Sequence, residues 1–352
     1  MDTSIREFSE FKILNHLDRV HAVLRGEIPP PVTLEIDPTN ACIHNCVWCI
    51  DARHRSDHPE TLPREVALKA VEDAANMGVR SLVVKGGGEP LVYPHIDELL
   101  RTARENEMET GIITNGERIL DHQDVIRETC TWLRISLDAG SKETHVATHR
   151  PKNPDAFDRI WQGVHAVVDD VYCGIIYIIH PATFHEMGVA ARRAKEAGCK
   201  YIGFKRVVAE KELFDTELYM SIDANYLFAK RQYEDQTFSV MGFRIYNFTK
   251  GVNAQPYEMC LGHHLVGILC ADGGVYACCA TRGRDAYRYG SIYEQSLSEI
   301  WQGERRRQIL EKIARGDCKH ICVGHSSYMR YDHYNDLFLY LSKSRRPHGN
   351  FL

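Results

Sequence analysis

Residues 42–49, Cys-Ile-His-Asn-Cys-Val-Trp-Cys, space three cysteines as Cys-x3-Cys-x2-Cys directly after an expected strand at 32–36. Three thiolates are soft ligands that suit iron or zinc. A structural zinc site needs four protein ligands, so zinc would require His44, folded back within its own loop. A four-iron cluster held by the three cysteines leaves one iron open, and it accounts better for a triad with no fourth cysteine nearby.

Downstream of this loop, short apolar runs alternate with helical patterns. The expected strands lie at 81–84, 111–113, 132–137, 174–179 and 201–207, and the expected helices at 63–77, 94–106, 122–130, 155–168, 185–197 and 224–235. Six β-α units in succession predict the α/β class, with a parallel sheet, right-handed crossovers and helices outside. Six units make a partial (β/α)6 TIM-like barrel, in which chemistry sits at the carboxyl ends of the strands.

The rest of the chain divides by composition. An amphipathic helix is expected at 5–26, and a Cys-rich stretch with a hairpin at 267–278 and a helix at 297–314 follows the barrel. The expected divisions are an N-terminal helix (1–31), the partial barrel (32–239), a C-terminal cysteine-rich auxiliary-cluster domain (240–330) and a tail (331–352).

Composition narrows the possible partners and the compartment. The 352 residues carry a formal net charge of −5, so nothing points to nucleic acid. No apolar run reaches the ~20 residues that span a bilayer, and the N-terminus lacks a secretory signal, so we expect a cytoplasmic protein without a membrane partner. In a reducing compartment, 12 cysteines indicate metal binding or catalysis rather than disulfides.

The triad of Cys42, Cys46 and Cys49 after the first barrel strand resembles the signature of the radical S-adenosylmethionine (SAM) superfamily. The resemblance implies that the three cysteines hold a [4Fe-4S] cluster and that SAM chelates the fourth iron. One electron then cleaves SAM to a 5′-deoxyadenosyl radical, which abstracts a substrate hydrogen. An external one-electron donor such as flavodoxin or ferredoxin is the expected partner.

The same resemblance implies SAM-binding residues at the strand ends, namely Trp48, Gly87, Gly88, Glu89, Ser136, Asp138 and Arg150. Trp48 matches an aromatic position placed against adenine, and the Gly-Gly-Glu-Pro stretch at 87–90 matches the motif that binds the methionine amine. Ser136 and Asp138 match positions around the SAM carboxylate and ribose. The alternatives are a plain turn for the glycines, a capping loop after the strand at 132–137, and a solvated Arg150.

A second cysteine group has the spacing Cys-x17-Cys-x39-Cys-x3-Cys and comprises Cys260, Cys278, Cys318 and Cys322. On their own, four thiolates fit an iron–sulfur cluster or zinc. After a radical SAM barrel, the stretch resembles twitch or SPASM domains. The resemblance implies one fully ligated auxiliary [4Fe-4S] cluster, with Cys279 competing with Cys278 as the second ligand.

Two cysteines of this region remain without a ligand role, Cys270 and Cys279. The plain interpretation is a buried thiol beside the cluster. The alternative is a catalytic thiol that returns a hydrogen atom to a substrate radical, as epimerases of the superfamily require.

Resemblance to twitch-type enzymes favours a small-molecule substrate, a carbohydrate, aminocyclitol or nucleoside, as in antibiotic biosynthesis. The outcome is epimerisation, dehydrogenation or decarboxylation, and maturation of a ribosomally made peptide or protein is the alternative function. A non-enzymatic metal scaffold is the other class. His180, Lys205 and Arg206 follow or end strands and are candidates for hydrogen bonds to a polar substrate.

Overall fold

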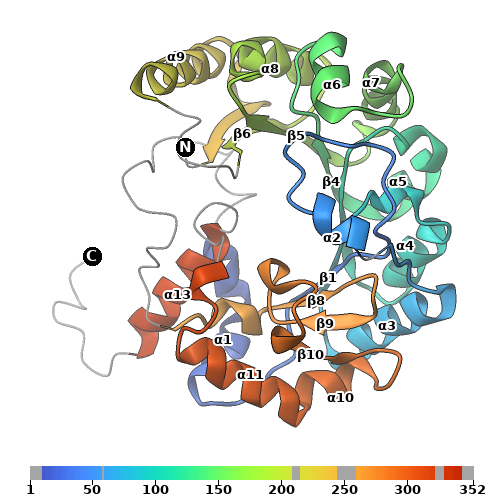
Figure 1. The fold of residues 1–352 in the computed structure, drawn as a ribbon, viewed down its shortest axis with the longest axis vertical. Helices are drawn as coiled ribbons and strands as arrows, with labels where there is room; N and C mark the ends of the chain where they lie inside the picture. Colours follow the sequence, from blue (N-terminus) through green and yellow to red (C-terminus); the bar gives the residue numbers. More distant parts are fainter. Residues whose placement is uncertain (1–9, 58, 208–214, 244–258, 322–328, 343–352) are drawn as a thin grey trace.

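The computed structural model describes residues 10–57, 59–207, 215–243, 259–321 and 329–342 (Figure 1). Their strands form one ten-stranded sheet in the order β10-β9-β8-β1-β2-β3-β4-β5-β6-β7. The strands are β1 Thr33–Ile36, β2 Ser81–Val84, β3 Glu109–Thr114, β4 Cys130–Ser136, β5 Tyr172–Ile179, β6 Tyr201–Arg206, β7 Ser239–Phe243, β8 Val266–Leu269, β9 Gly274–Tyr276 and β10 Arg288–Ser291.

The expected α/β architecture is confirmed, and the sheet extends it at both edges. Strands β1 to β6 are the six predicted ones, and all their neighbours pair in parallel. Beyond β6 lies the parallel strand β7, which the sequence interpretation did not include and which spans the expected boundary at 239/240. On the other side, β8 pairs in parallel with β1, and the predicted hairpin at 267–278 is formed by β8 and the antiparallel β9. Strand β10, which the sequence interpretation did not include, pairs antiparallel with β9. The domain boundary itself stays a prediction.

Helices cover the outer side of the curved sheet, and the cysteine loop with α2 lies inside the curve (Figure 1). The helices are α1 Leu17–Leu24, α2 Ala52–Asp57, α3 Arg64–Met77, α4 Ile96–Glu105, α5 Gln123–Thr129, α6 Lys142–His149, α7 Ala156–Val167, α8 Met187–Glu196, α9 Thr216–Tyr233, α10 Leu297–Gln302, α11 Glu304–Ala314 and α13 Met329–Ser342.

Local sequence explains most helix limits that differ from expectation. Helix α6 was not predicted, although Ser141 caps it through a hydrogen bond that its Oγ accepts from the Thr144 N–H. Helix α9 begins at Thr216, eight residues before the expected start, because Asp215 caps it in the same way. The expected helix at 297–314 is split at Gly303 into α10 and α11.

Burial alternates along the strands and separates two environments. In β1, Leu34 and Ile36 are fully buried against the helix layer, whereas Thr33 and Glu35 on the other face are only partly buried. Outside the barrel, α1 and α13 pack together around Val20 and Phe338. None of the described helices combines the length and apolar character needed to cross a membrane. The inner face of the sheet is therefore where polar chemistry collects.

Candidate active site

The cysteine loop between β1 and α2 is fixed on one side by the segment that ends β2. The backbone N–H of Gly88 donates to the Thr39 carbonyl at 3.1 Å, and that of Glu89 donates to the Ala41 carbonyl at 2.8 Å. A Cβ on Gly88 would lie 2.0 Å from the Ala41 carbonyl oxygen. Glycine is thus required here for the close approach of two backbones.

On its other side the loop is fixed by the end of α6. The N–H groups of Asn45 and Val47 donate to the carbonyls of His149 and Thr148, both at 2.9 Å. The Lys152 N–H in turn donates to the carbonyl of Ile43 at 3.0 Å. Backbone bonds on both sides therefore hold the loop that carries the three cysteines.

Cys42, Cys46 and Cys49 share one partly buried space. Burial raises the pKa of Cys42 to about 11 and also raises the pKa of Cys49, and the Cys46 thiolate adds to both shifts. The Arg55 guanidinium lies 3.8 Å from the Cys49 sulfur. Three neighbouring soft ligands that a metal would hold as thiolates, with a cation beside them, fit an iron–sulfur cluster.

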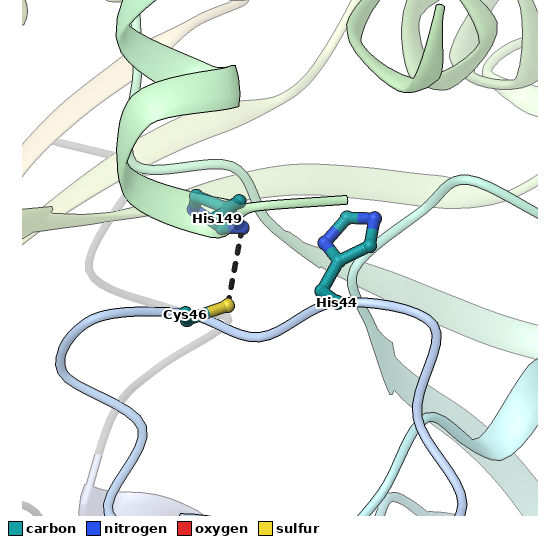
Figure 2. A group of neighbouring side chains, drawn as sticks. All are labelled: His44, Cys46 and His149. Atoms are coloured by element: carbon teal, nitrogen blue, oxygen red, sulfur yellow. Dashed lines mark hydrogen bonds between the residues drawn. The ribbon is translucent and has the colours of Figure 1, made fainter. Parts of the chain in front are cut away.

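His149 lies between Cys46 and Asp138, and Figure 2 shows its side facing Cys46. Its Nδ1 lies 3.5 Å from the Cys46 sulfur, and its Nε2 lies 3.2 Å from Asp138 Oδ2. The same oxygen accepts a hydrogen bond from Trp48 Nε1 at 3.1 Å, and Asp138 Oδ1 accepts one from the Ile178 N–H at 2.7 Å. Both oxygens of Asp138 are therefore bound by the protein itself.

His44, the ligand that a zinc interpretation would need, lies close to Cys46 and His149. One ligand atom from each of these three residues lies within 4.8 Å of the others. The Nε2 atom of His44 is 2.9 Å from a carboxylate oxygen of Glu117. Burial, followed by the neighbouring His149, lowers the pKa of His44 to about 3, so this imidazole is neutral at pH 7.

Glu89 is buried and held by three donors. Its Oε1 accepts from the Leu91 N–H at 3.0 Å and the Thr114 hydroxyl at 2.5 Å, and its Oε2 accepts from the Asn115 N–H at 2.7 Å. Burial nevertheless raises its pKa to about 7, since the hydrogen bonds only partly offset the loss of hydration. The structure places Glu89 beside the cysteine loop, and its contact with SAM stays a prediction.

The other expected SAM-binding residues differ in their surroundings. Trp48 packs on His180, with ring centroids 5.1 Å apart. Ser136 is partly buried at the carboxyl end of β4. Arg150 is exposed, and with a φ of +46° it ends α6 in the left-handed region. Gly87 lies against the Asn40 side chain. Their roles toward SAM stay predictions.

The second cysteine group gathers around β10. Cys260 and Cys278 both contribute to the raised pKa of Tyr289, whose largest cause is burial. Cys318 contributes in the same way at Tyr287, and Cys322 lies outside the described residues. The Asn335 amide donates to the Cys260 sulfur at 3.4 Å.

A buried cation lies beside this group. Arg306 is completely buried, stacks 3.9 Å above the Trp301 ring and packs against Tyr289. Its Nε and Nη1 and the Tyr289 hydroxyl have no hydrogen-bond partner among the described residues. A buried cation with no carboxylate partner among the described residues is costly. Tyr289, whose pKa Cys260 and Cys278 raise, links this cation to the second cysteine group.

Cys278 and Cys279 face different surroundings, although their sulfurs are 3.9 Å apart. Cys279 and burial are the main causes that raise the pKa of Cys278, and Cys260 adds to them. At Cys279, burial raises the pKa, but Cys278, Lys85 and Arg282 lower it overall. Cys278 as the ligand, with Cys279 as its competitor, stays a prediction.

Arg282 joins the two cysteine regions, and sequence reasoning missed it. Its guanidinium lies 2.8 Å from Asp37 at the end of β1 and 3.4 Å from Asp51, two residues after the triad. Both Arg282 and Asp37 are buried, and Lys85 pairs with Glu35 at 2.8 Å nearby. The Cys270 sulfur is 3.8 Å from the same Asp37 oxygen.

Two family models match the chain at the expected places. Residues 36–200 match the radical SAM superfamily, and residues 262–323 match the SPASM iron–sulfur cluster-binding domain. The first range contains the triad. The second contains Cys270, Cys278, Cys279, Cys318 and Cys322, and begins two residues after Cys260. The first match shows a radical SAM enzyme, which implies SAM and a [4Fe-4S] cluster. The second shows a SPASM domain, which implies auxiliary iron–sulfur clusters.

Individual relatives match only parts of their own length. An S-adenosylmethionine-dependent nucleotide dehydratase of Lacinutrix mariniflava is 26% identical over 145 residues, which cover 39% of this chain and 29% of the relative. A PqqA peptide cyclase of Granulibacter bethesdensis is 34% identical over 89 residues, or 25% of this chain and 24% of the relative. The chain thus spans less than a third of either protein.

A solved structure shows the fold over most of the chain. Streptococcus suis SuiB bound to S-adenosylmethionine has a TM-score of 0.62 at 17% identity and covers 87% of this chain and 72% of its own. At this identity the likeness establishes the common fold.

Proposed function

This chain belongs to the radical SAM superfamily and carries a C-terminal SPASM domain, and from that premise we propose that it acts on a small polar substrate, a carbohydrate, aminocyclitol or nucleoside. When bound, the cluster and SAM supply a radical that takes a hydrogen atom from a substrate carbon. Cys42, Cys46 and Cys49 would hold that cluster, and Cys260, Cys278, Cys318 and Cys322 one auxiliary cluster.

The observation that carries the substrate class is the set of charges between the two cysteine regions. Asp37, Arg282 and Asp51 form a continuous chain of ion pairs there, and Lys85 and Glu35 form a second pair. Charged groups in an interior with little water have lost their hydrogen bonds to water. Such groups favour ligands that supply new hydrogen bonds in their place. A substrate rich in hydroxyl or amino groups does so, whereas an apolar one leaves them unsatisfied.

Cys270 is the thiol that we propose as hydrogen-atom donor, with epimerisation as the reaction. It follows β8 at the carboxyl edge of the sheet, beside Asp37. A substrate carbon that has lost a hydrogen atom takes one from the Cys270 S–H on the opposite face. One electron from an external donor such as flavodoxin or ferredoxin, with one proton, then restores the thiol.

The surroundings of the two candidate thiols support this choice. Burial, and next the Asp37 carboxylate, raise the pKa of Cys270 well above its ordinary value, so its hydrogen stays on sulfur at pH 7. The Cys279 sulfur lies 3.9 Å from that of Cys278, the proposed cluster ligand, so we assign Cys279 to the surroundings of the auxiliary cluster.

The test uses the reconstituted enzyme with SAM, a reductant and a panel of deuterated aminocyclitols, sugars and nucleosides. We expect deuterium to move from one substrate into 5′-deoxyadenosine. In deuterated water, the epimer should gain one deuterium, and Cys270→Ala should lose that gain. Transfer without solvent deuterium in the product would exclude the thiol step, and no transfer from the panel would exclude this substrate class.

Peptide maturation is the second candidate, favoured by the 34% identity to a PqqA peptide cyclase. The same deuterium assay with a deuterated peptide separates the two. Transfer from a peptide, with none from the small molecules, would establish the second candidate.

A further inference from the structure

His149 is a buried residue that the sequence did not single out. It is the last residue of α6, and only 2% of its surface is exposed. Figure 2 shows its ring directed at the sulfur of Cys46, at 3.5 Å from Nδ1. The backbone bond from the Asn45 N–H to the His149 carbonyl fixes this position.

The two neighbours of the ring determine which nitrogen donates. A cysteine that ligates iron has no proton, so the hydrogen of the contact with Cys46 must come from Nδ1 of His149. On the far side, Asp138 Oδ2 lies 3.2 Å from Nε2. Asp138 is itself held by hydrogen bonds from Trp48 and Ile178, so its charge stays beside Nε2, although this contact lacks hydrogen-bond geometry.

Other nearby imidazoles lack this geometry. His145 stacks on His149 with ring centroids 4.6 Å apart, but both its nitrogens are buried without a hydrogen-bond partner among the described residues. His44 directs its Nε2 at Glu117. Of these three described imidazoles, His149 is the one in hydrogen-bond contact with a cysteine of the triad.

We propose that His149 is a positioning residue that donates a hydrogen bond to the cluster ligand Cys46 and thereby raises the reduction potential of the SAM-binding cluster. A donor to sulfur stabilises the reduced cluster more than the oxidised one, because reduction adds negative charge to the sulfurs. This proposal depends on the radical SAM domain and not on the proposed substrate. The higher reduction potential makes it easier for the cluster to accept the activating electron.

The test measures the reduction potential of the holoenzyme without SAM or substrate, by redox titration followed by electron paramagnetic resonance. The signal that changes when SAM is added afterwards identifies the cluster on the triad. His149→Phe should lower that reduction potential by about 59 mV, which corresponds to a tenfold change in the equilibrium constant of a one-electron reduction. The signal that does not respond to SAM should keep its potential.

His145→Phe is the matched control, since it replaces the stacked neighbour and leaves the bond to Cys46 in place. It should leave the potential unchanged. An unchanged potential in His149→Phe, or an equal fall in His145→Phe, would overturn the proposal.

A second measurement needs no variant. Pulsed magnetic resonance of the reduced wild-type enzyme, labelled with ¹⁵N-histidine, should show a nitrogen coupling at the SAM-responsive cluster. If His149→Phe loads no cluster, a nitrogen coupling in the wild-type enzyme supports the hydrogen bond, and an absent coupling refutes it.

Discussion

Gly88→Ala tests whether the glycine-rich stretch after β2 shapes the cysteine loop before any SAM is bound. The new Cβ would lie 2.0 Å from the Ala41 carbonyl oxygen, and the other near atoms are also backbone. Since such contacts below 3.0 Å are essentially never seen, the two segments must separate by about 1 Å. No rotation of a side chain relieves this contact.

The separation has a cost that follows from the structure. Opening by about 1 Å lengthens the bond from the Glu89 N–H to Ala41, now 2.8 Å, beyond hydrogen-bond range. The bond from Gly88 to Thr39 lengthens too, and each lost bond costs about 1 kcal/mol. We expect about 2 kcal/mol of lost stability, together with displacement of Cys42, the residue next to Ala41.

Gly87→Ala is the matched control. Its Cβ would meet the Asn40 side-chain oxygen at 2.3 Å, the end of a side chain that can rotate away. The assay compares iron bound per chain after anaerobic reconstitution without SAM, and the urea midpoint of the cluster-free protein. Gly88→Ala should lose the iron of the triad while Gly87→Ala keeps it, and equal iron and equal midpoints in the two variants would refute the reasoning.

Three further changes have defined outcomes. Arg282→Met leaves the Asp37 carboxylate buried without its cation, so urea unfolding should show a loss of about 3–5 kcal/mol, and a loss below 1 kcal/mol would contradict the ion pair. Burial raises the pKa of Glu89 from 4.5 to about 7, so between these pH values the folded protein holds a proton that the unfolded chain has lost. The free energy of unfolding should therefore fall by about 3 kcal/mol as pH rises from 4.5 to 7. Glu89→Gln should remove this pH dependence in the cluster-free protein, and an unchanged slope would contradict it. Cys278→Ser should lose the iron of one cluster while Cys279→Ser keeps it, and the reverse result would exchange their roles.

Local signals in the sequence predicted most of the barrel. Apolar runs of strand length alternate with helical periodicity from β1 to α8, and each predicted strand appears with its limits shifted by few residues. The cysteine spacings and the Asp-Gly-Gly turn of the hairpin are also local, so their recognition needed no tertiary information. The strand β7 was missed because its short apolar run stands where the composition changes.

The missed site residues have the opposite character, since their partners are far away in the chain. Arg282 is 245 residues from Asp37, and His149 is 103 residues from Cys46. A single Arg or His in a sequence is usually solvated or part of a core, and only the folded sheet shows what it faces. Asp138 was recognised by its position after β4, but its bonds to Trp48 and Ile178 depend on the packing of neighbouring loops.

The pairing of β8 with β1 has a consequence for how the two iron–sulfur regions act together. Because these strands are parallel and adjacent, Asp37 after β1 and Cys270 after β8 lie at the same edge of the sheet. Arg282 then binds both Asp37 and Asp51, which follows the triad directly. The C-terminal region is therefore a continuation of the catalytic sheet, and its Cys270 and Arg282 lie beside Asp37 at the carboxyl end of β1. A movement that separated β8 from β1 would break this ion-pair chain, so the geometry favours a C-terminal region that stays in place during the reaction.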